Sequence, residues 1–500
     1  MDFSQEIGGA RFCMPICHRV INTDISEDFT LPDYNPDIRR ALYVKETMLP
    51  PTKFISGNKL DVNGVVDYTV VYISNEGKLC SAPLSAEYSF SLPLESMNEF
   101  DMNEGVSVMV HSVAESSNVR VSSPRRLQIR SYINSSVSAW GKKNCTERID
   151  GIKEQSTLQR LVKNVSCADI LCESSDVVVL EDEYILPSEN CRVALAESSV
   201  LIDGCRVEGE LIRISGDVLL KILVLCEQEE SSECVVRKLH FEAESDIIGS
   251  YTQNCSCRIN GSVTDVSMTV EEGRVNTEAN LVIEVCLAQS CDVAYAADAY
   301  SVDQKSEISL KKQMLPTIIA NKIFNVSQSE RIPLEELSFA EGAQIVDASA
   351  SAYVQDVSVE DEKVIFKGTC KYNVICMLDG EYSYCEAKAP FRCECEGDGN
   401  GEVYSFDASV DVLNCRARAD GKALNIDAEL GIACTVMGGV EVDMLERASF
   451  GAALDTSAGV WTVYYTQPDE TAWDIAKRYS VTSDDIKGDP KNDRFVIIER

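Results

Sequence analysis

The sequence predicts a mainly β fold, in which three homologous β-sandwich-like repeats in tandem are followed by a small α+β module. Three observations predict this fold. A strand with a central glycine occurs three times at constant spacing, and apolar and polar residues alternate along each copy. From residue 461 onward the pattern changes to strand, helix, helix, strand.

The glycine-centred strands cover residues 60–70, 212–222 and 364–374. The same 152 residues separate Gly64 from Gly216 and Gly216 from Gly368. Successive side chains of a strand point to opposite faces, so the apolar residues of each copy share one face, which we expect to be buried. This set comprises Leu60, Val62, Val66 and Val70, then Ile212, Ile214, Val218 and Ile222, then Val364, Phe366, Cys370 and Val374.

The three central glycines allow two structural interpretations. Glycine inside a strand marks a bulge or a bend at a sheet corner, or a place where another element packs closely over the backbone. The sequence does not separate these interpretations.

The repeat extends beyond the glycine-centred strands. Segments 41–44, 193–196 and 345–348 keep the same spacing, and segments 126–133, 274–281 and 423–430 echo one another after loops of different length. We therefore place the repeats at residues 1–150, 151–305 and 306–450, with a linker at 451–460. Because Leu158, Leu161 and Val162 have helix-like spacing, we expect a short connection between repeats at residues 144–172.

The C-terminal module, residues 461–500, begins with a short strand at 461–465 and a turn at 467–471. Thr471 is placed to cap a helix over 472–479, with Asp474 as the reciprocal capping residue. A second capping box at 482–485 opens a short helix, and residues 494–499 form a closing strand.

This module resembles the LysM family. The resemblance rests on Tyr464, on Asp469 to Thr471, on the Trp473-Asp474-Ile475-Ala476-Lys477-Arg478-Tyr479 helix, and on Val481-Thr482. It implies a shallow groove that binds N-acetylglucosamine-containing glycans or a partner protein between two loops. The implied groove residues are Gln467, Pro468, Asp469, Glu470, Thr471 and Ala472 in one loop, and Lys487, Gly488, Asp489, Pro490, Lys491 and Asn492 in the other. Pro468-Asp469 stands where the family usually has a turn glycine.

The repeats resemble the SPOCS-type domains of endospore-forming Firmicutes, which often carry an early Pro-Asp-Ile motif like Pro36-Asp37-Ile38 and often precede a C-terminal LysM. The whole layout is similar to that of spore coat morphogenetic proteins. This resemblance implies a protein of the mother-cell cytoplasm, recruited to the outer forespore surface. It also implies a SpoIVA-like coat ATPase as the partner of the LysM.

The composition limits which classes of partner the protein can bind and which cellular compartment suits it. With 81 Asp and Glu against 46 Lys and Arg, the formal net charge is −35, which argues against nucleic acid and anionic lipid as partners. The first residues show neither a basic start nor an apolar run, and no apolar stretch is long enough to span a membrane, so we expect a reducing cytoplasm. Most of the 21 cysteines should then act as small hydrophobic residues, among them Cys226, Cys286, Cys370, Cys376 and Cys434.

The sequence offers little catalytic chemistry, and we expect no enzyme and no cofactor. The three histidines, His18, His111 and His240, lie in different contexts. Cys13, Cys17 and His18 resemble a zinc-ligand cluster, and the Cys255/Cys257 and Cys393/Cys395 pairs could chelate a soft metal or oxidise. We expect ordinary packing or surface thiols instead of a metal site.

The leading hypothesis is therefore a non-enzymatic assembly scaffold that uses several weak faces on one chain, with the LysM as its docking module and self-association as a further contact. The alternative is a binder of peptidoglycan or of N-acetylglucosamine glycans. A cell-wall hydrolase would need a catalytic domain, whereas residues 1–450 read as repeats of one unit.

Overall fold

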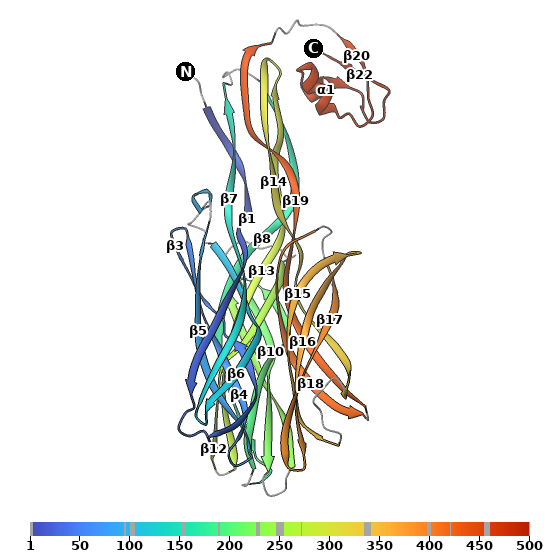
Figure 1. The fold of residues 1–500 in the computed structure, drawn as a ribbon. Helices are drawn as coiled ribbons and strands as arrows, with labels where there is room; N and C mark the ends of the chain where they lie inside the picture. The colour runs from blue at the N-terminus through green and yellow to red at the C-terminus, as the bar shows by residue number, and fades with distance from the viewer. Residues whose placement is uncertain are drawn as a thin grey trace.

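Long antiparallel strands dominate the chain, as Figure 1 shows. The computed structural model describes residues 4–94, 97–100, 106–151, 157–188, 191–226, 231–246, 255–271, 273–334, 342–397, 402–420, 422–454 and 461–499. The predicted mainly β fold is confirmed, with several separate sheets.

The strands up to residue 453 fall into three consecutive sets. The first set contains β1 (Ser4–Thr30), β2 (Ile38–Met48), β3 (Thr52–Ser56), β4 (Lys59–Ser74), β5 (Leu79–Pro93), β6 (Val106–Ser123) and β7 (Arg126–Asp150), with a 3₁₀ turn at Met97–Glu99. The second set contains β8 (Leu158–Ile185), β9 (Cys191–Glu208), β10 (Leu211–Cys226), β11 (Ser231–Asp246), β12 (Cys255–Glu271) and β13 (Arg274–Ser301). The third set contains β14 (Gln304–Pro333), β15 (Gln344–Glu360), β16 (Lys363–Leu378), β17 (Glu381–Glu396), β18 (Val403–Asp420) and β19 (Ala423–Ala453).

Strand pairing follows the same scheme in all three sets. The glycine-centred strands β4, β10 and β16 each lie between the strands before and after them, and β3 adds a short extra pairing in the first set. The last strands, β7, β13 and β19, each pair with the first and the penultimate strand of their own set. A short parallel pairing of Arg447–Ser449 with Arg148–Asp150 joins the first and third sets into a six-stranded sheet.

Each set encloses an apolar core between its two sheets. In the second set, Val218 and Ile222 of β10 pack in one cluster with Leu281 and Ile283 of β13. The first and third sets contain corresponding clusters. The predicted apolar faces of β4, β10 and β16 are buried, with every member at most 2% exposed, as alternation along a strand requires.

Both predicted interpretations of the central glycines, close packing over the backbone and a bulge, apply in the structure. A Cβ on Gly64 would overlap the ring of Tyr88, the residue paired with it on β5. Gly216 and Gly368 are covered in the same way by Phe241 and Phe391, and they also face a backbone carbonyl beside a register shift in the preceding strand. Glycine is therefore required by close packing in all three sets, and a bulge accompanies it in two.

The three sets also share cores with one another. One buried cluster joins Leu42, Ala194 and Val346, which are 152 residues apart, with two further triplets of the same spacing. These triplets are Val71, Leu223 and Ile375, and Ile73, Leu225 and Met377. Because equivalent positions of all three sets meet in one cluster, the sets are arranged around a common axis.

Above this body, the outer halves of the longest strands continue as a narrower stalk, visible in Figure 1 around β7, β14 and β19. Its core again uses all three sets, for example Phe12, Tyr295 and Leu315 in one cluster. A second stalk cluster contains Ile149, Ala299 and Phe450.

The expectation that residues 144–172 form a short connection between repeats is wrong, because most of this segment is β-strand. β7 continues to Asp150 and β8 begins at Leu158, so strands occupy most of this segment. Leu161 packs into the stalk core while its neighbour Val162 is 56% exposed, which is the alternation of a strand. Pairing with β13 along the whole length of β8 overrides the helix-like spacing. No helix among the described residues is long and apolar enough to cross a membrane.

Candidate functional site

The C-terminal module contains β20 (Thr462–Tyr465), α1 (Ala472–Tyr479), β21 (Ile486–Lys487) and β22 (Phe495–Ile498), with β22 between β20 and β21. The predicted cap of α1 is confirmed: the Asp474 backbone N–H donates to Thr471 Oγ1, and the Thr471 N–H donates to Asp474 Oδ2. The expected second helix is only a 3₁₀ turn, Ser483–Asp485, because Ile486 leaves it at once to begin β21.

The first predicted groove loop, residues 467–472, is organised by Glu470. This carboxylate accepts hydrogen bonds from Tyr464 Oη at 3.0 Å and from the Gln467 N–H at 3.3 Å, and it pairs with Arg478 at 2.6 Å. Asp469 has a left-handed backbone with φ of 65°, which aspartate tolerates better than most residues, so this turn forms without a glycine. Gln467, Pro468, Asp469 and Thr471 are exposed, whereas Glu470 and Ala472 are partly buried.

The second predicted groove loop, residues 487–492, also closes on itself. Asp489 accepts hydrogen bonds from the Lys491 N–H at 3.0 Å and from Asn492 Nδ2 at 2.6 Å. Lys487, Gly488, Asp489, Lys491 and Asn492 are exposed, and Pro490 is partly buried.

The two loops meet where Thr466, just before the first, donates to the Asp493 carbonyl just after the second, at 2.7 Å. The structure thus brings the predicted loops to one side of the module. Several of their polar groups are already engaged within the loops.

An exposed apolar surface lies on the module's sheet. Trp461 is 66% exposed, Val463 56%, Tyr465 65% and Phe495 49%. Tyr465 and Phe495 form an edge-to-face pair with ring centroids 6.3 Å apart. We call these four residues the outer sheet face. The alternating residues Tyr464, Val496 and Ile498 instead pack toward α1. The sequence carried a signal for this face, since apolar residues occupy both faces of 461–465.

Helix α1 holds the module against the end of β13. Trp473 Nε1 donates to Asp298 Oδ2 at 2.9 Å, and Lys477 Nζ lies 2.7 Å from both oxygens of the same carboxylate. Tyr300 packs edge-to-face on Trp473 and donates to the Val481 carbonyl at 2.6 Å. Burial raises the pKa of Tyr300 to about 12, so its hydroxyl remains a donor at neutral pH. The module's attachment to the stalk therefore uses α1, and the outer sheet face lies on the other side of the sheet.

A second candidate site lies where the three sets meet. A cavity of about 240 Å³ is lined by residues of all three sets, including Lys45, His111, Glu284 and Asp411. Burial raises the pKa of Asp411 to about 7, an effect that Lys45 only partly offsets. Burial lowers the pKa of His111, which favours its neutral form.

Three ion pairs join different sets, and Lys45 of one pair also lines this cavity. Lys45 lies 3.0 Å from Glu197, Lys221 lies 2.6 Å from Asp347, and Arg258 lies 2.6 Å from Asp407. All six side chains are at most 22% exposed, and each pair joins two different sets. We infer that these pairs fix how the sets are arranged, since a buried charge that lost its partner would be costly. Sequence reasoning missed the cavity because its residues lie far apart along the chain.

The cysteines and histidine that the sequence suggested as possible metal ligands contact different partners in the structure. Cys13 is buried against Trp140, whereas His18 Nδ1 lies 2.9 Å from Ser138 Oγ. Cys257 faces Cys205, and Cys395 faces Cys434, so each Cys-x-Cys pair interacts with the opposite sheet. Within the described ranges, Cys13, Cys17 and His18 form no group of three metal donors.

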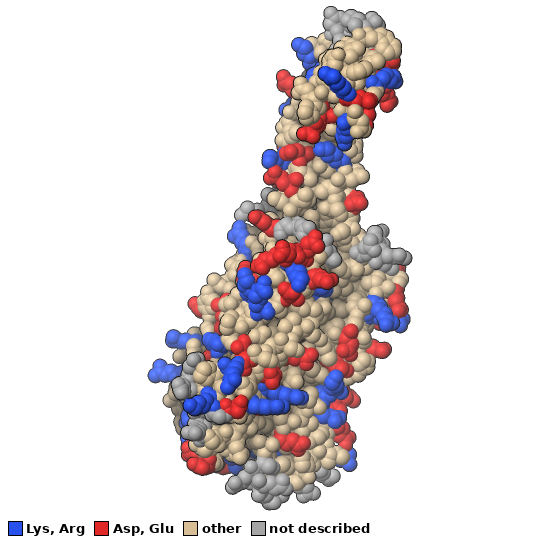
Figure 2. All heavy atoms as spheres, turned by 90° about the vertical axis from the view of Figure 1, so that its right-hand side faces the viewer, with Lys and Arg blue, Asp and Glu red and all other residues tan. Residues whose placement is uncertain are grey.

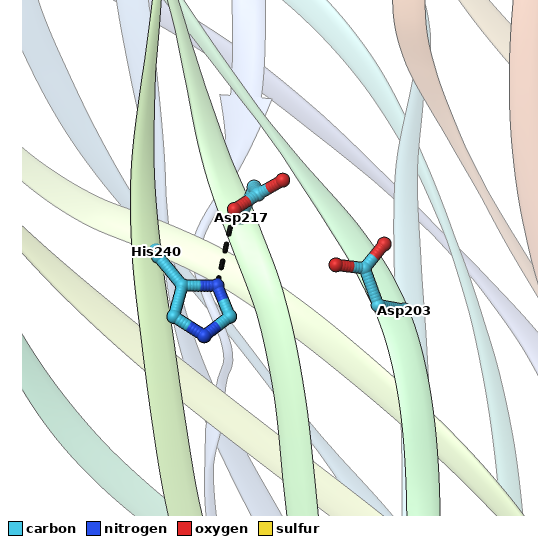
Figure 3. A group of neighbouring side chains, drawn as sticks. All are labelled: Asp203, Asp217 and His240. Atoms are coloured by element: carbon cyan, nitrogen blue, oxygen red, sulfur yellow. Dashed lines mark hydrogen bonds and ion pairs between the residues drawn. The ribbon is translucent and has the colours of Figure 1, made fainter.

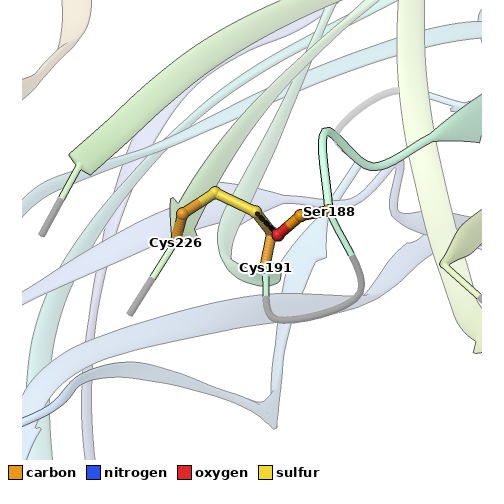
Figure 4. Close-up of a disulfide and its surroundings, with 3 residues drawn as sticks. All are labelled: Ser188, Cys191 and Cys226. Carbon is orange, nitrogen blue, oxygen red and sulfur yellow. Dashed lines mark hydrogen bonds between the residues drawn. A yellow bond between two sulfur atoms is a disulfide. The ribbon is translucent and has the colours of Figure 1, made fainter. Parts of the chain in front are cut away.

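The expectation that Cys226 acts as a small hydrophobic residue is wrong. Cys226, at the end of β10, forms a disulfide with Cys191 at the start of β9 (Figure 4). The two residues are paired directly across the two strands, and this pairing brings their sulfur atoms together.

Comparison with known proteins finds no matching family model, no matching curated protein and no matching solved structure.

Proposed function

We propose that this chain is a non-enzymatic scaffold of spore coat assembly, similar to SipL. In this proposal, residues 1–150, 151–305 and 306–450 are three copies of one SPOCS-type β-sandwich module. Residues 461–500 are a LysM that docks on a SpoIVA-like coat ATPase at the forespore surface, in the mother-cell cytoplasm. The recurring strand pairing and the triplets spaced by 152 residues support the three-copy interpretation.

The observation that carries the docking proposal is the outer sheet face. Four large apolar side chains stand exposed at the tip of the stalk, on the side of the module that α1 does not use. Exposed aromatic clusters of this kind are typical of protein interfaces.

The partner should present an apolar patch bordered by basic residues, because the chain as a whole is strongly acidic. On the face drawn in Figure 2, acidic and basic side chains are interspersed, without a continuous basic field of the kind that binds nucleic acid.

The alternative function, binding of peptidoglycan or other N-acetylglucosamine glycans, would use the two loops. Their exposed residues support it, whereas the hydrogen bonds within each loop leave fewer groups for a sugar. The two functions therefore predict different sensitive residues.

The test measures binding of the full chain to a purified SpoIVA-like ATPase and, separately, to purified peptidoglycan. Replacing Tyr465 and Phe495 by serine should weaken ATPase binding at least tenfold, while the same change at Val179, which is 57% exposed on the body, should leave it unchanged. Wall binding that is lost on Asp489→Ala and retained in the sheet variant would favour the glycan function. A fluorescent fusion that stays diffuse during sporulation would overturn the coat proposal.

A further inference from the structure

Three potential metal ligands meet on the sheet formed by β9, β10 and β11. Asp203, Asp217 and His240 each come from a different strand, and each offers a donor atom within 4.8 Å of the other two (Figure 3). His240 Nδ1 lies 3.3 Å from Asp217 Oδ1. Among the described residues, this is the one group in which three such donors come together.

Strand pairing brings these three residues onto one face, and a β-bulge lies beside them. Asp217 and His240 are paired directly across β10 and β11, so their side chains share a face. On β9, the pairing with β10 passes from Gly204 opposite Ser215 to Ile202 opposite Gly216, which leaves Asp203 as the extra residue. Leu201 of β9 is paired with Asp217, and Asp203 lies two residues further along β9, so alternation places Asp203 on the same face as Asp217.

The arrangement has an electrostatic cost that a cation would remove. Two carboxylates held this close on a rigid sheet repel each other, and like charges on neighbouring strands are destabilising. Lys238 lies 3.4 Å from Asp217, but its side chain is flexible and 63% exposed. A cation bound between the two carboxylates can therefore displace the Lys238 ammonium from Asp217.

We propose that Asp203, Asp217 and His240 form a binding site for a divalent cation of the Mn²⁺ and Zn²⁺ class. Two carboxylate oxygens and one imidazole nitrogen combine hard donors with a borderline donor, a set that suits these ions. Three protein ligands on one exposed face leave the remaining coordination positions for water or for an anionic group of a partner.

The site belongs to the second set alone. The residues that follow the other two central glycines are Val65 and Thr369, and the residues paired with them are Glu87 and Pro390. Neither pair can supply the Asp–His combination. Close packing accounts for the central glycine in all three sets, whereas the Asp203, Asp217 and His240 group occurs beside only one of these glycines.

Mn²⁺ is the appropriate probe, because zinc would also bind the many free thiols of the chain. The sequence contains three histidines, so histidine-selective labelling gives three imidazole signals in NMR spectra of the full-length protein. The His240 signal should broaden at the lowest Mn²⁺ concentration, with His18 and His111 as internal references. Mn²⁺ should also raise the unfolding temperature.

Asp203→Asn and Asp217→Asn should each weaken Mn²⁺ binding at least tenfold, measured by the electron paramagnetic resonance signal of free Mn²⁺. Lys238→Gln should strengthen binding, since it removes the competing charge. Asp246→Asn, six residues from His240 at the exposed end of the same strand, is the matched control and should have no effect. Equal broadening of all three histidines, or affinity unchanged in both aspartate variants, would overturn the proposal.

Discussion

Asp298 and Trp473 link the stalk to the C-terminal module through a hydrogen bond of 2.9 Å between the indole nitrogen and the carboxylate. The same carboxylate pairs with Lys477 on the next turn of α1. The module is therefore fixed at one orientation to the stalk, and its outer sheet face is presented away from that contact.

Replacing Asp298 by alanine should release α1 from the stalk without unfolding the body. Each hydrogen bond to a charged group contributes about 1.5–3 kcal/mol, and this change removes both the Trp473 and the Lys477 contacts. Amide hydrogen exchange should rise in α1 and remain slow in β10. Asp292→Ala, on an exposed position of the same strand, is the control. Unchanged exchange in α1 would show that the contact contributes nothing.

The central glycines should differ in how they respond to substitution. A Cβ at Gly64 meets only the Tyr88 side chain among its nearest atoms, whereas a Cβ at Gly216 also meets the Leu201 carbonyl. Both alanine variants should lose about 1–3 kcal/mol of unfolding free energy through overpacking. Tyr88→Leu should relieve Gly64→Ala in a double-mutant cycle, whereas Phe241→Leu should not relieve Gly216→Ala. Urea unfolding measures both cycles, and equal relief at the two sites would contradict this account.

Alternation along the strands allowed the buried faces of β4, β10 and β16 to be predicted, because residue parity alone decides which side chains point inward. It could not reveal the cluster that joins Leu42, Ala194 and Val346, since the arrangement of the sets around an axis depends on contacts between distant segments.

For the candidate sites, the resemblance of residues 461–500 to LysM modules implied that the two loops of the C-terminal module lie next to each other. The Asp203, Asp217 and His240 group was not predictable in the same way. It depends on the register in which β9 and β11 pair with β10, and a one-residue shift in register changes which face a side chain joins.

The Cys191–Cys226 disulfide should contribute measurably to stability. It closes a loop with a sequence separation of 35, and cross-links of this kind contribute about 2–4 kcal/mol by restricting the unfolded chain. A reducing agent should lower the urea midpoint of the parent protein but leave the Cys191→Ala/Cys226→Ala variant unchanged. Intact-mass analysis before and after reduction checks the bond itself, and no mass difference would contradict the pairing.

The cavity between the three sets should make stability depend on pH through Asp411. Its folded pKa of about 7 lies above the unfolded value of about 3.9, so between these values the native state holds a proton that the unfolded state has lost. Stability contributed by this group is therefore complete at low pH and falls as pH rises toward 7, by at most about 1.4 kcal/mol per pH unit.

Asp411→Asn removes this dependence, because asparagine resembles the neutral acid at every pH. The variant should be more stable than the parent at about pH 8, and the difference should shrink toward about pH 5, where Asp411 is protonated in the native state. Urea unfolding across this range measures the difference between the two proteins, so other titrating groups cancel. Asp420→Asn, exposed at the end of the same strand, is the matched control. A difference for Asp411→Asn that does not vary with pH would show that water reaches the Asp411 carboxylate freely and keeps it ionised.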